Sequence, residues 1–182
     1  MADNSQDFEL INNFLDGDES AFNRLAKKYQ EKIYWQARRM TGSHDDADEI
    51  LQEVLLVMYN KLNTFKFESS FFTWLYRVTS TRSLNFIKKN KIKKIFSLDI
   101  LINQPDENIT ISDDIEQKEQ LVSIESKMQK LPPKQREVFI MRSFDELSYD
   151  EISAITGKSV GAIKANYFHA MSKMKDMMKH EK

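Results

Sequence analysis

The chain has 182 residues, 41% of them apolar, and a formal net charge of −1. This length allows one ordinary domain or two small ones, each with a modest core. The absence of cysteine excludes disulfides, thiol catalysis and thiolate metal sites. No run approaches the roughly 18 apolar residues of a membrane helix, and the start "MADNSQDFEL" is acidic and polar, unlike a secretory signal. We therefore expect a cytoplasmic protein without membrane insertion.

The small net charge conceals a segregation of charge along the chain. Residues 1–87 carry 10 basic and 13 acidic side chains, whereas 88–96 carries five lysines and no acid. Residues 97–120 reverse the sign, with seven acids and one lysine, and 121–182 carries 11 basic and 8 acidic groups. Any contact with a polyanion is therefore expected to involve particular segments of the chain and not the whole surface.

Helical periodicity dominates the sequence. Only four glycines and three prolines occur, and apolar side chains recur at helical spacing nearly throughout, which predicts an all-α fold. A first long helix is expected from about Glu19 to Gly42, and Ser43 caps a second helix that ends near Thr64. A third helix begins at about Ser70.

A composition change divides the chain. The acidic segment 97–120 contains Pro105 and no sustained apolar period, so it is predicted to be flexible or only locally helical. We therefore expect two small helical domains, 1–92 and 121–182, joined by a linker over 93–120.

The stretch "SYDEISAITGKSVGAIKANYFHAM" has the layout of a helix-turn-helix. Ser148 and Glu151 form a capping box, Gly157 permits the turn, and Ser159 caps the second helix. The outer face of that helix is small, polar and basic, which suits the major groove of DNA, and Asn166 fits a bidentate contact with adenine. The alternative is an ordinary helical corner with a solvated outer face.

An acidic strip marks the second predicted helix, "SHDDADEILQEVLLVMYNKL". Acids in its first turn, such as Asp45 and Asp46, complement the helix dipole and need no further explanation. Gln52 and Glu53 lie beyond that turn and extend the strip beside the buried stripe. This extension favours a docking surface for a basic partner.

The stretch "FESSFFTWLYRVTSTRSLNFIKKNK" combines aromatic residues with a run of lysines. In helical phase, Phe71, Leu75 and Val78 form a core stripe, while Arg77 lies on another face. Aromatic rings hold single-stranded bases by stacking while basic groups track the backbone, and the connection before the helix suits a pocket for a flipped-out base. Trp74 fits either stacking on a base or packing in the core.

These stretches, in this order, resemble the bacterial RNA polymerase sigma factors of the extracytoplasmic-function (ECF) group. The segment "DADEILQEVLLVMY" is similar to the family's D-A-E-D-L-x-Q-E-V-F motif, and "FESSFFTWLYRV" resembles its F-x-x-x-S-x-F-x-T-W-L-Y-R-I motif. The segment "LPPKQREVFIMRSFDELSYDEISAITGKSVGAIKANYFHAM" resembles its C-terminal helix-turn-helix. The resemblance covers about 18–174 and implies a protein that binds core RNA polymerase and directs promoter-specific initiation.

The resemblance implies a role for each matching position. The clamp helices of the polymerase's largest subunit would contact Asp46, Asp48, Glu49, Gln52 and Glu53, called the acidic strip below. The minus-ten element would be recognised and melted by Phe65, Phe67, Ser69, Ser70, Trp74, Arg77, Thr81, Asn85 and Lys88. The double-stranded minus-thirty-five element would be read by Ser159, Gly161, Ala162, Lys164, Ala165, Asn166, His169 and Lys173. The group also commonly has an anti-sigma factor as a regulatory partner.

The sequence departs from the family pattern at positions that set promoter specificity. Phe67, Thr81 and Asn85 stand where many members carry Gly, Asn and Asp, and Asn166 and His169 stand where they carry Arg. The resemblance therefore still implies the general role of the family for this chain, but the promoter consensus of other members cannot be transferred to it.

Two other classes of function fit the sequence less well. An enzyme is disfavoured because the three histidines are scattered and the chain has neither an H-E-x-x-H motif nor a nucleotide-binding loop. Neither a cofactor nor a metal site is expected. A stand-alone helix-turn-helix regulator explains the C-terminal segment equally well, but not the acidic strip together with "FESSFFTWLYR".

Overall fold

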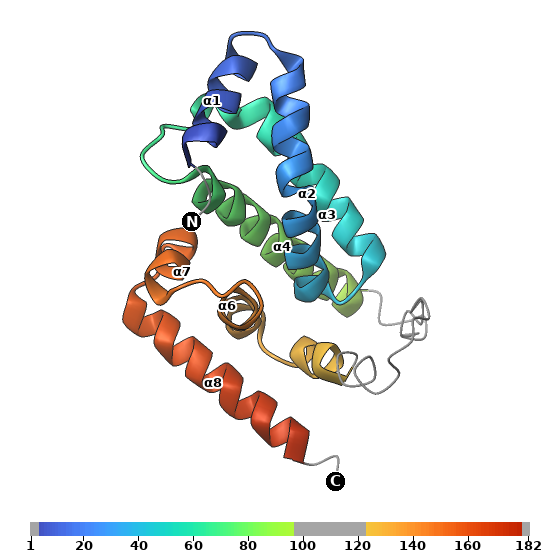
Figure 1. Cartoon of the computed structure of the whole chain (residues 1–182). Helices are drawn as coiled ribbons and strands as arrows, with labels where there is room; N and C mark the ends of the chain where they lie inside the picture. The colour runs from blue at the N-terminus through green and yellow to red at the C-terminus, as the bar shows by residue number, and fades with distance from the viewer. Residues whose placement is uncertain (1–3, 97–122, 180–182) are drawn as a thin grey trace, which may run out of the picture.

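The computed structural model describes residues 4–96 and 123–179. Within these ranges all regular elements are helices, which confirms the all-α prediction. Residues 123–129 form a short helical segment. The labelled elements are α1 (Asn4–Leu15), α2 (Glu19–Thr41), α3 (His44–Lys61), the 3-10 turn η1 (Leu62–Thr64), α4 (Phe71–Phe96), α6 (Pro133–Ser143), α7 (Tyr149–Thr156) and α8 (Val160–Lys179) (Figure 1).

The predicted linker 93–120 falls mostly on residues outside the described ranges. Its first four residues belong to α4, which continues to Phe96 and so passes the expected boundary at residue 92. The run of lysines is therefore part of a long helix.

The helix ends that the sequence predicts are confirmed. Gly42 ends α2 in the left-handed region at φ +81°, and Ser43 caps α3 by accepting from the Asp46 amide at 3.2 Å. The capping box of Ser148 and Glu151 opens α7, and Gly157 ends that helix at φ +69°. These ends depend on local chemistry, which explains why the sequence alone reveals them.

The first helix, α1, is an element that the sequence analysis does not predict. Its Asp7 is fully buried and accepts hydrogen bonds from Lys28 Nζ at 2.6 Å and from the Tyr29 hydroxyl at 2.5 Å. Its Phe8 ring packs on the rings of Phe65 and Phe67, with centroids 5.9 and 5.1 Å away. A buried carboxylate with two donors thus holds α1 against α2.

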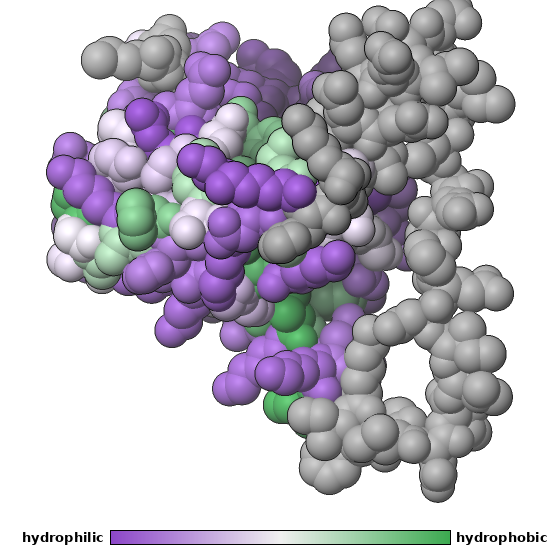
Figure 2. Space-filling model, turned by 90° about the horizontal axis from the view of Figure 1, so that it is seen from below, coloured by the Kyte–Doolittle hydropathy of each residue, from purple (hydrophilic) through white to green (hydrophobic). Residues whose placement is uncertain are grey.

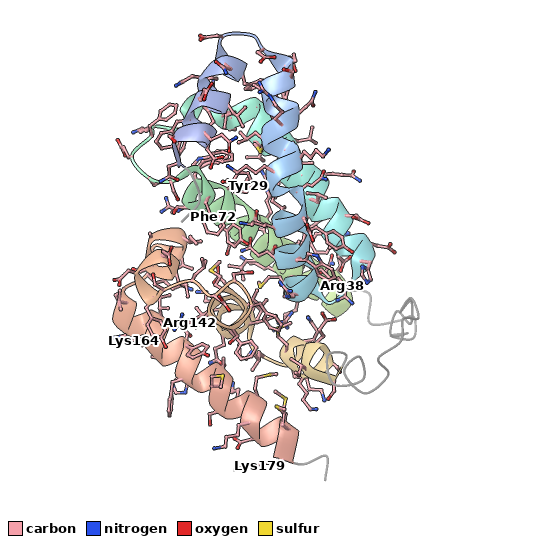
Figure 3. All side chains as sticks on the ribbon, viewed as in Figure 1. Tyr29, Arg38, Phe72, Arg142, Lys164 and Lys179 are labelled. Atoms are coloured by element: carbon pink, nitrogen blue, oxygen red, sulfur yellow. The ribbon has the colours of Figure 1, made fainter. Side chains whose placement is uncertain are left out.

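Helices α1 to α4 enclose the first hydrophobic core. Tyr29 lies between α2 and α4 (Figure 3), where its ring meets Phe71 edge-on at 5.3 Å. The fully buried members from the three long helices include Leu25, Tyr29 and Ile33 of α2, Ile50, Val54 and Met58 of α3, and Phe71 and Leu75 of α4.

The second half of the described chain, 123–179, packs directly against the first half, 4–96. Helix α7 contacts α4, α6 contacts α2 and α4, and α8 packs on α6 and α7 (Figure 1). Two further apolar clusters cross the boundary. In one, Met40 of α2 is buried with Met128 and Ile140, and in the other Tyr76 of α4 is buried with Val138 and Ile152. The two halves therefore share apolar contacts in this conformation.

A buried arginine joins the halves at the end of α2. Arg136 of α6 is 6% exposed, and its guanidinium donates to the carbonyl oxygens of Met40, Gln129 and Leu131. The Gln129 side chain donates to the Arg39 carbonyl at 2.9 Å. The last carbonyls of a helix have no partner within it, so these donors satisfy groups that burial would otherwise leave unpaired.

Arg136→Ala is expected to lower the free energy of unfolding by about 3 kcal/mol or more, because it leaves several buried carbonyls without a donor. Urea unfolding followed by circular dichroism measures the change. Arg24→Ala is the matched control, since Arg24 is 59% exposed and pairs with Asp18 at the surface, where such a pair is worth about 0.5 kcal/mol. Equal losses in the two variants would contradict the role of Arg136.

Candidate polymerase and nucleic-acid interfaces

The acidic strip lies on the outer side of α3. Asp48, Glu49 and Gln52 are exposed, and Glu53 is half-buried and pairs with Arg82 of α4 at 3.5 Å. One turn further along, Leu56 is 63% exposed. The helix therefore presents acids followed by an apolar side chain, an arrangement suited to a basic partner surface with an apolar contact.

The two aromatic residues in the loop before α4 that are predicted to contact the minus-ten element, Phe65 and Phe67, differ in exposure. Phe65 is 5% exposed and belongs to the first core, whereas Phe67 is 38% exposed and holds a left-handed backbone at φ +58°. Ser69 is exposed, and Ser70 accepts from the Thr73 amide at 3.1 Å and so caps α4. In this conformation Phe67, and not Phe65, is presented to solvent.

Trp74 is half-buried on α4. Its ring stacks on Phe71, with centroids 5.7 Å apart and planes at 24°, and lies 6.1 Å from Phe65. The sequence leaves two roles open for Trp74, stacking on a base or packing in the core, and in this conformation its ring packs in the core.

The outer face of α4 carries the remaining minus-ten candidates. Asn85 and Lys88 are exposed near its basic end. Arg77 donates from Nε to the Ile155 carbonyl at 3.1 Å and from Nη2 to the Ala154 carbonyl, both at the end of α7. Arg77 and Thr81 are themselves exposed, and Arg77 contacts the second half of the chain through its guanidinium.

A second buried face of α4 is a feature that the sequence analysis misses. Tyr76, Thr79, Ser80 and Ser83 are buried there, although the sequence predicts only the stripe of Phe71, Leu75 and Val78. The signal that could have revealed it is the group of small hydroxyl residues at helical spacing, which lets another helix approach closely.

The second helix of the predicted helix-turn-helix is α8. Ile163, Ala170 and Met174 are buried on its inner side. Ser159 accepts from the Ala162 amide at 3.3 Å and caps the helix, and the amide of Asn166 donates to the Ala162 carbonyl at 3.0 Å. The exposed candidates on its outer side are Gly161, Ala162, Lys164, Ala165, His169 and Lys173.

The surface of α8 is more apolar than expected. Phe168 is 70% exposed and Met171 43% exposed, which the sequence analysis does not anticipate. Lys164 lies near the start of the helix and Lys179 at its end (Figure 3). Viewed from below Figure 1, the molecule is largely hydrophilic, with apolar patches between the polar side chains (Figure 2).

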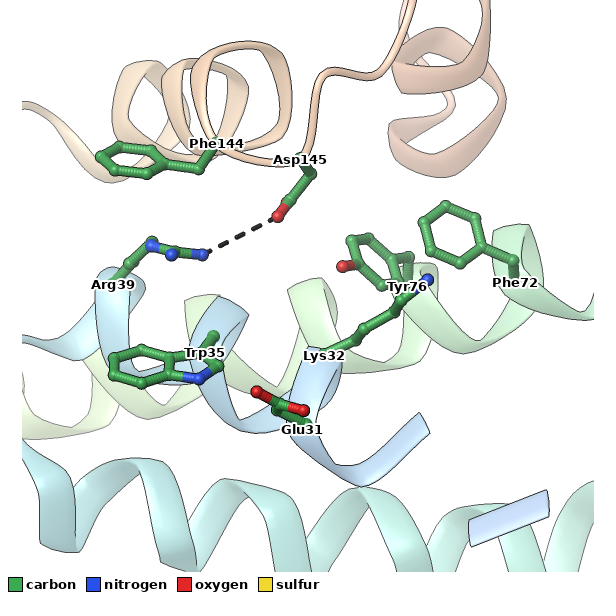
Figure 4. A pocket seen from close by; sticks show the side chains of 8 residues that line it. All are labelled: Glu31, Lys32, Trp35, Arg39, Phe72, Tyr76, Phe144 and Asp145. Carbon is green, nitrogen blue, oxygen red and sulfur yellow. Dashed lines mark ion pairs between the residues drawn. The ribbon is translucent and has the colours of Figure 1, made fainter. Parts of the chain in front are cut away.

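A cavity of about 420 Å³ lies between α2, α4 and the connection from α6 to α7 (Figure 4). Arg39 lies between two rings, 5.5 Å from the centroid of Trp35 and 4.5 Å from that of Phe144, and its Nη1 is 3.9 Å from Asp145 Oδ1. Burial raises the pKa of Asp145 to about 6, although Arg39 and Lys32 oppose the shift. A carboxylate that is costly to ionise thus lies at the boundary of the halves.

Neither a metal site nor a membrane span is found in the described part of the chain. Across residues 4–96 and 123–179, no three histidine, aspartate or glutamate side chains gather closely enough to hold a metal ion. Within the same ranges, no helix has the length and apolarity needed to cross a membrane.

Comparison with known proteins identifies two matched regions. Residues 25–92 match the model of Sigma-70 region 2, and residues 121–174 match that of Sigma-70, region 4. The ECF RNA polymerase sigma factor SigW of Bacillus subtilis is 31% identical over 159 residues, covering 81% of this chain and 83% of that protein. The ECF RNA polymerase sigma-E factor of Escherichia coli is 29% identical over 184 residues, covering 93% of each chain.

Solved structures share the fold. CnrH in complex with the cytosolic domain of CnrY superposes with a TM-score of 0.73 at 18% identity and covers all of both chains. RpoE of Bartonella quintana, in complex with the anti-sigma factor NepR, superposes with a TM-score of 0.69 at 19% identity and covers 88% of this chain and 98% of that one.

The two matched regions, in this order on an all-α chain, define a transcription initiation factor of the sigma-70 class, which is not an enzyme. With SigW 31% identical over most of both lengths, the chain belongs to the family of ECF RNA polymerase sigma factors. Such a protein directs promoter-specific initiation by RNA polymerase.

Asp145→Asn is expected to change the pH dependence of stability. Because the folded-state pKa of Asp145, about 6, exceeds its ordinary value of 3.8, the folded protein holds this proton more tightly than the unfolded chain. Ionisation therefore costs stability at neutral pH, roughly 2–3 kcal/mol, and the cost disappears as the pH falls from about 6 to about 4. The wild type should gain stability relative to Asp145→Asn over that window.

Urea unfolding at a series of pH values measures this difference. The charged and titratable groups around the same cavity are Glu31, Lys32, Arg39 and Tyr76, and they are present in both proteins, so the comparison isolates the carboxylate. Asp176→Asn, at an exposed position of α8, controls for the loss of one acid. Parallel pH profiles for wild type and Asp145→Asn would contradict the prediction.

Proposed function

We propose that this sigma factor binds core RNA polymerase through the acidic strip of α3 and reads promoter DNA with α4 and α8. The observation that carries the proposal is the exposure of Asp48, Glu49 and Gln52 of the strip, on a helix whose opposite side is buried in the first core. The partner surface would be the clamp helices of the polymerase's largest subunit. In this proposal residues 1–92 bind polymerase and the minus-ten element, 121–182 bind the minus-thirty-five element, and 93–120 connect them.

For the minus-ten element, the proposal assigns base contact to the loop before α4 and phosphate contact to the helix. The half-exposed ring of Phe67 and the exposed Ser69 support a pocket for an unstacked base. Lys88 begins a series of exposed lysines that continues to Lys93 and suits the DNA backbone.

For the minus-thirty-five element, the proposal places α8 in the major groove of double-stranded DNA. Small residues on its first turns allow close approach to base edges, and Asn166 and His169 are the candidates for base contact. Lys164 and Lys173 are assigned to phosphates, where they would contribute affinity without sequence preference.

We also propose an anti-sigma factor as a regulatory partner and the cytoplasm as the site of action. Support comes from the two structures of the same fold, since one is described with the anti-sigma factor NepR and the other with the cytosolic domain of CnrY. No feature of α1 to α8 favours the stand-alone regulator over this proposal.

A reconstituted transcription assay tests the proposal. Core RNA polymerase and the purified chain are incubated with a promoter library, and the transcript starts are sequenced. Specific starts are expected only when both components are present. Tight binding to an operator by the chain alone, with no initiation by the pair, would favour a stand-alone regulator instead.

Glu49→Lys is expected to weaken binding to core polymerase by about tenfold or more, because it reverses a charge in the middle of the acidic strip. Fluorescence anisotropy with labelled protein measures the affinity. Glu9→Lys makes the same reversal at an exposed position of α1 and should change the affinity by less than about twofold. Equal effects of the two substitutions would contradict a specific role for the strip.

Asn166→Ala is expected to relax base preference at one position of the minus-thirty-five element by about 1–3 kcal/mol. Lys173→Ala should weaken binding to all promoters alike and reduce the salt dependence of binding. Initiation on the promoter library, scored position by position, separates the two effects. An unchanged base preference in Asn166→Ala would remove this residue from the reading surface.

A further inference from the structure

The connection between η1 and α4, residues 65–70, lies beside α1 (Figure 1). In the middle of this connection, Phe67 holds a left-handed backbone at φ +58°. Residues with a side chain rarely adopt this conformation, because their Cβ crowds the following carbonyl oxygen. Contacts with the surrounding structure must therefore stabilise Phe67.

Backbone hydrogen bonds do not provide this stabilisation. In the part of the chain that the structure describes, the peptide groups of 66–69 make no hydrogen bond to another backbone group. On either side, the Phe65 amide donates to the Leu62 carbonyl at 3.1 Å, and the Trp74 amide donates to the Ser70 carbonyl at 3.3 Å. The backbone of the connection is thus held at its ends and not in its middle.

Two aromatic rings contact the Phe67 side chain. Phe8 of α1 meets it edge-on, with centroids 5.1 Å apart and planes at 84°, and the Phe65 centroid is 4.9 Å away. Phe65 belongs to the first core, and Phe8 is half-buried and lies 5.9 Å from Phe65. Aromatic pairs at these separations stabilise one another beyond the area that they bury. One ring of the core and one ring of α1 therefore support Phe67.

The position of Phe8 is fixed by the residue before it. Asp7 is fully buried and accepts from Lys28 Nζ and the Tyr29 hydroxyl of α2. A buried carboxylate keeps its donors, because a loss of either one would leave polar groups unpaired. Phe8 is thus attached to a rigid part of α1, which makes it a firm support for the connection.

We propose that Phe8 is a positioning residue for promoter recognition. With Phe65, it holds the Phe67 ring in the orientation in which that ring stacks on an unstacked base of the minus-ten strand. The inference rests on the proposed minus-ten role of Phe67, and it assigns to α1 a part in DNA recognition without contact to the DNA.

The expected benefit of this support is preorganisation. A ring that is already in place loses little freedom when a base stacks on it. Without Phe8, the Phe67 backbone can leave the left-handed conformation, and only a fraction of the molecules then presents the ring correctly. Apparent affinity for the base falls in proportion to that fraction.

A double-mutant cycle in the full chain tests this coupling. Phe8→Ala, Phe67→Gly and the double variant are each assayed with core RNA polymerase, at concentrations that saturate the polymerase, on a promoter with randomised minus-ten bases. Phe67→Gly should lower initiation by about fivefold or more, because a stacking ring is lost. Phe8→Ala should lower initiation by about threefold or more in the wild-type background and leave it unchanged in the Phe67→Gly background.

Base preference provides a readout that a merely structural role would not change. Phe8→Ala and Phe67→Gly should relax the preference at the same minus-ten position. The matched control is Phe14→Ala, since Phe14 is another half-buried ring of α1 and packs on Phe22 and Tyr59 at 5.3 Å each, away from the connection. This control should leave the minus-ten preference unchanged.

A second variant keeps the test valid if Phe8→Ala does not fold, as judged by circular dichroism. Phe8→Leu retains most of the buried apolar volume but removes the ring, and it should show the same dependence on Phe67 when taken through the same cycle.

The inference and the proposed function can fail separately. Equal losses from the Phe8 substitution in both backgrounds, or no effect of Phe67→Gly, would overturn the positioning role while specific initiation by the wild type persists. Absence of specific initiation by the wild type would instead refute the proposed function.

Discussion

The arrangement of the two halves depends on how the end of α2 is satisfied. The last carbonyls of this helix lie against the second half, where unpaired acceptors are costly. Arg136 and Gln129 supply the donors, to Met40 and Arg39 respectively. Gly42 completes the arrangement, since a Cβ there would lie 2.7 Å from the Gln129 side chain and the φ of +81° disfavours other residues. The docking of α6 is thus tied to the termination of α2.

Donation from an arginine to the carbonyls of a helix end also occurs at the end of α7. There Arg77 of the first half donates to carbonyls of the second half, so each half contributes an arginine to a helix end of the other. Between these two points α4 is buried on two faces, and its small hydroxyl residues, Thr79, Ser80 and Ser83, allow α6 to approach. The packing of the two halves therefore depends on a second face of α4 in addition to the one buried in the first core.

The sequence predicts those parts of the fold that depend on interactions between residues close together in the chain. The ends at Gly42 and Gly157 and the caps at Ser43 and Ser148 follow from interactions within a few residues. Helix α1 was not predicted, because its docking depends on a buried Asp7 that only the distant Lys28 and Tyr29 satisfy. The minus-ten candidates show the same limit, since helical phase does not reveal that Phe65 belongs to the core.

The sequence by itself determined the helical class, most helix boundaries, the helix-turn-helix and the family, because periodicity, capping and motif order are written within short stretches. Only the tertiary structure decided which aromatic of the "FESSFFTW" region faces solvent and that Trp74 packs on Phe71. It also decided that Arg77 meets α7 in this conformation. Those outcomes depend on contacts between residues far apart in the chain, and an exposed and a buried polar side chain look alike in a sequence.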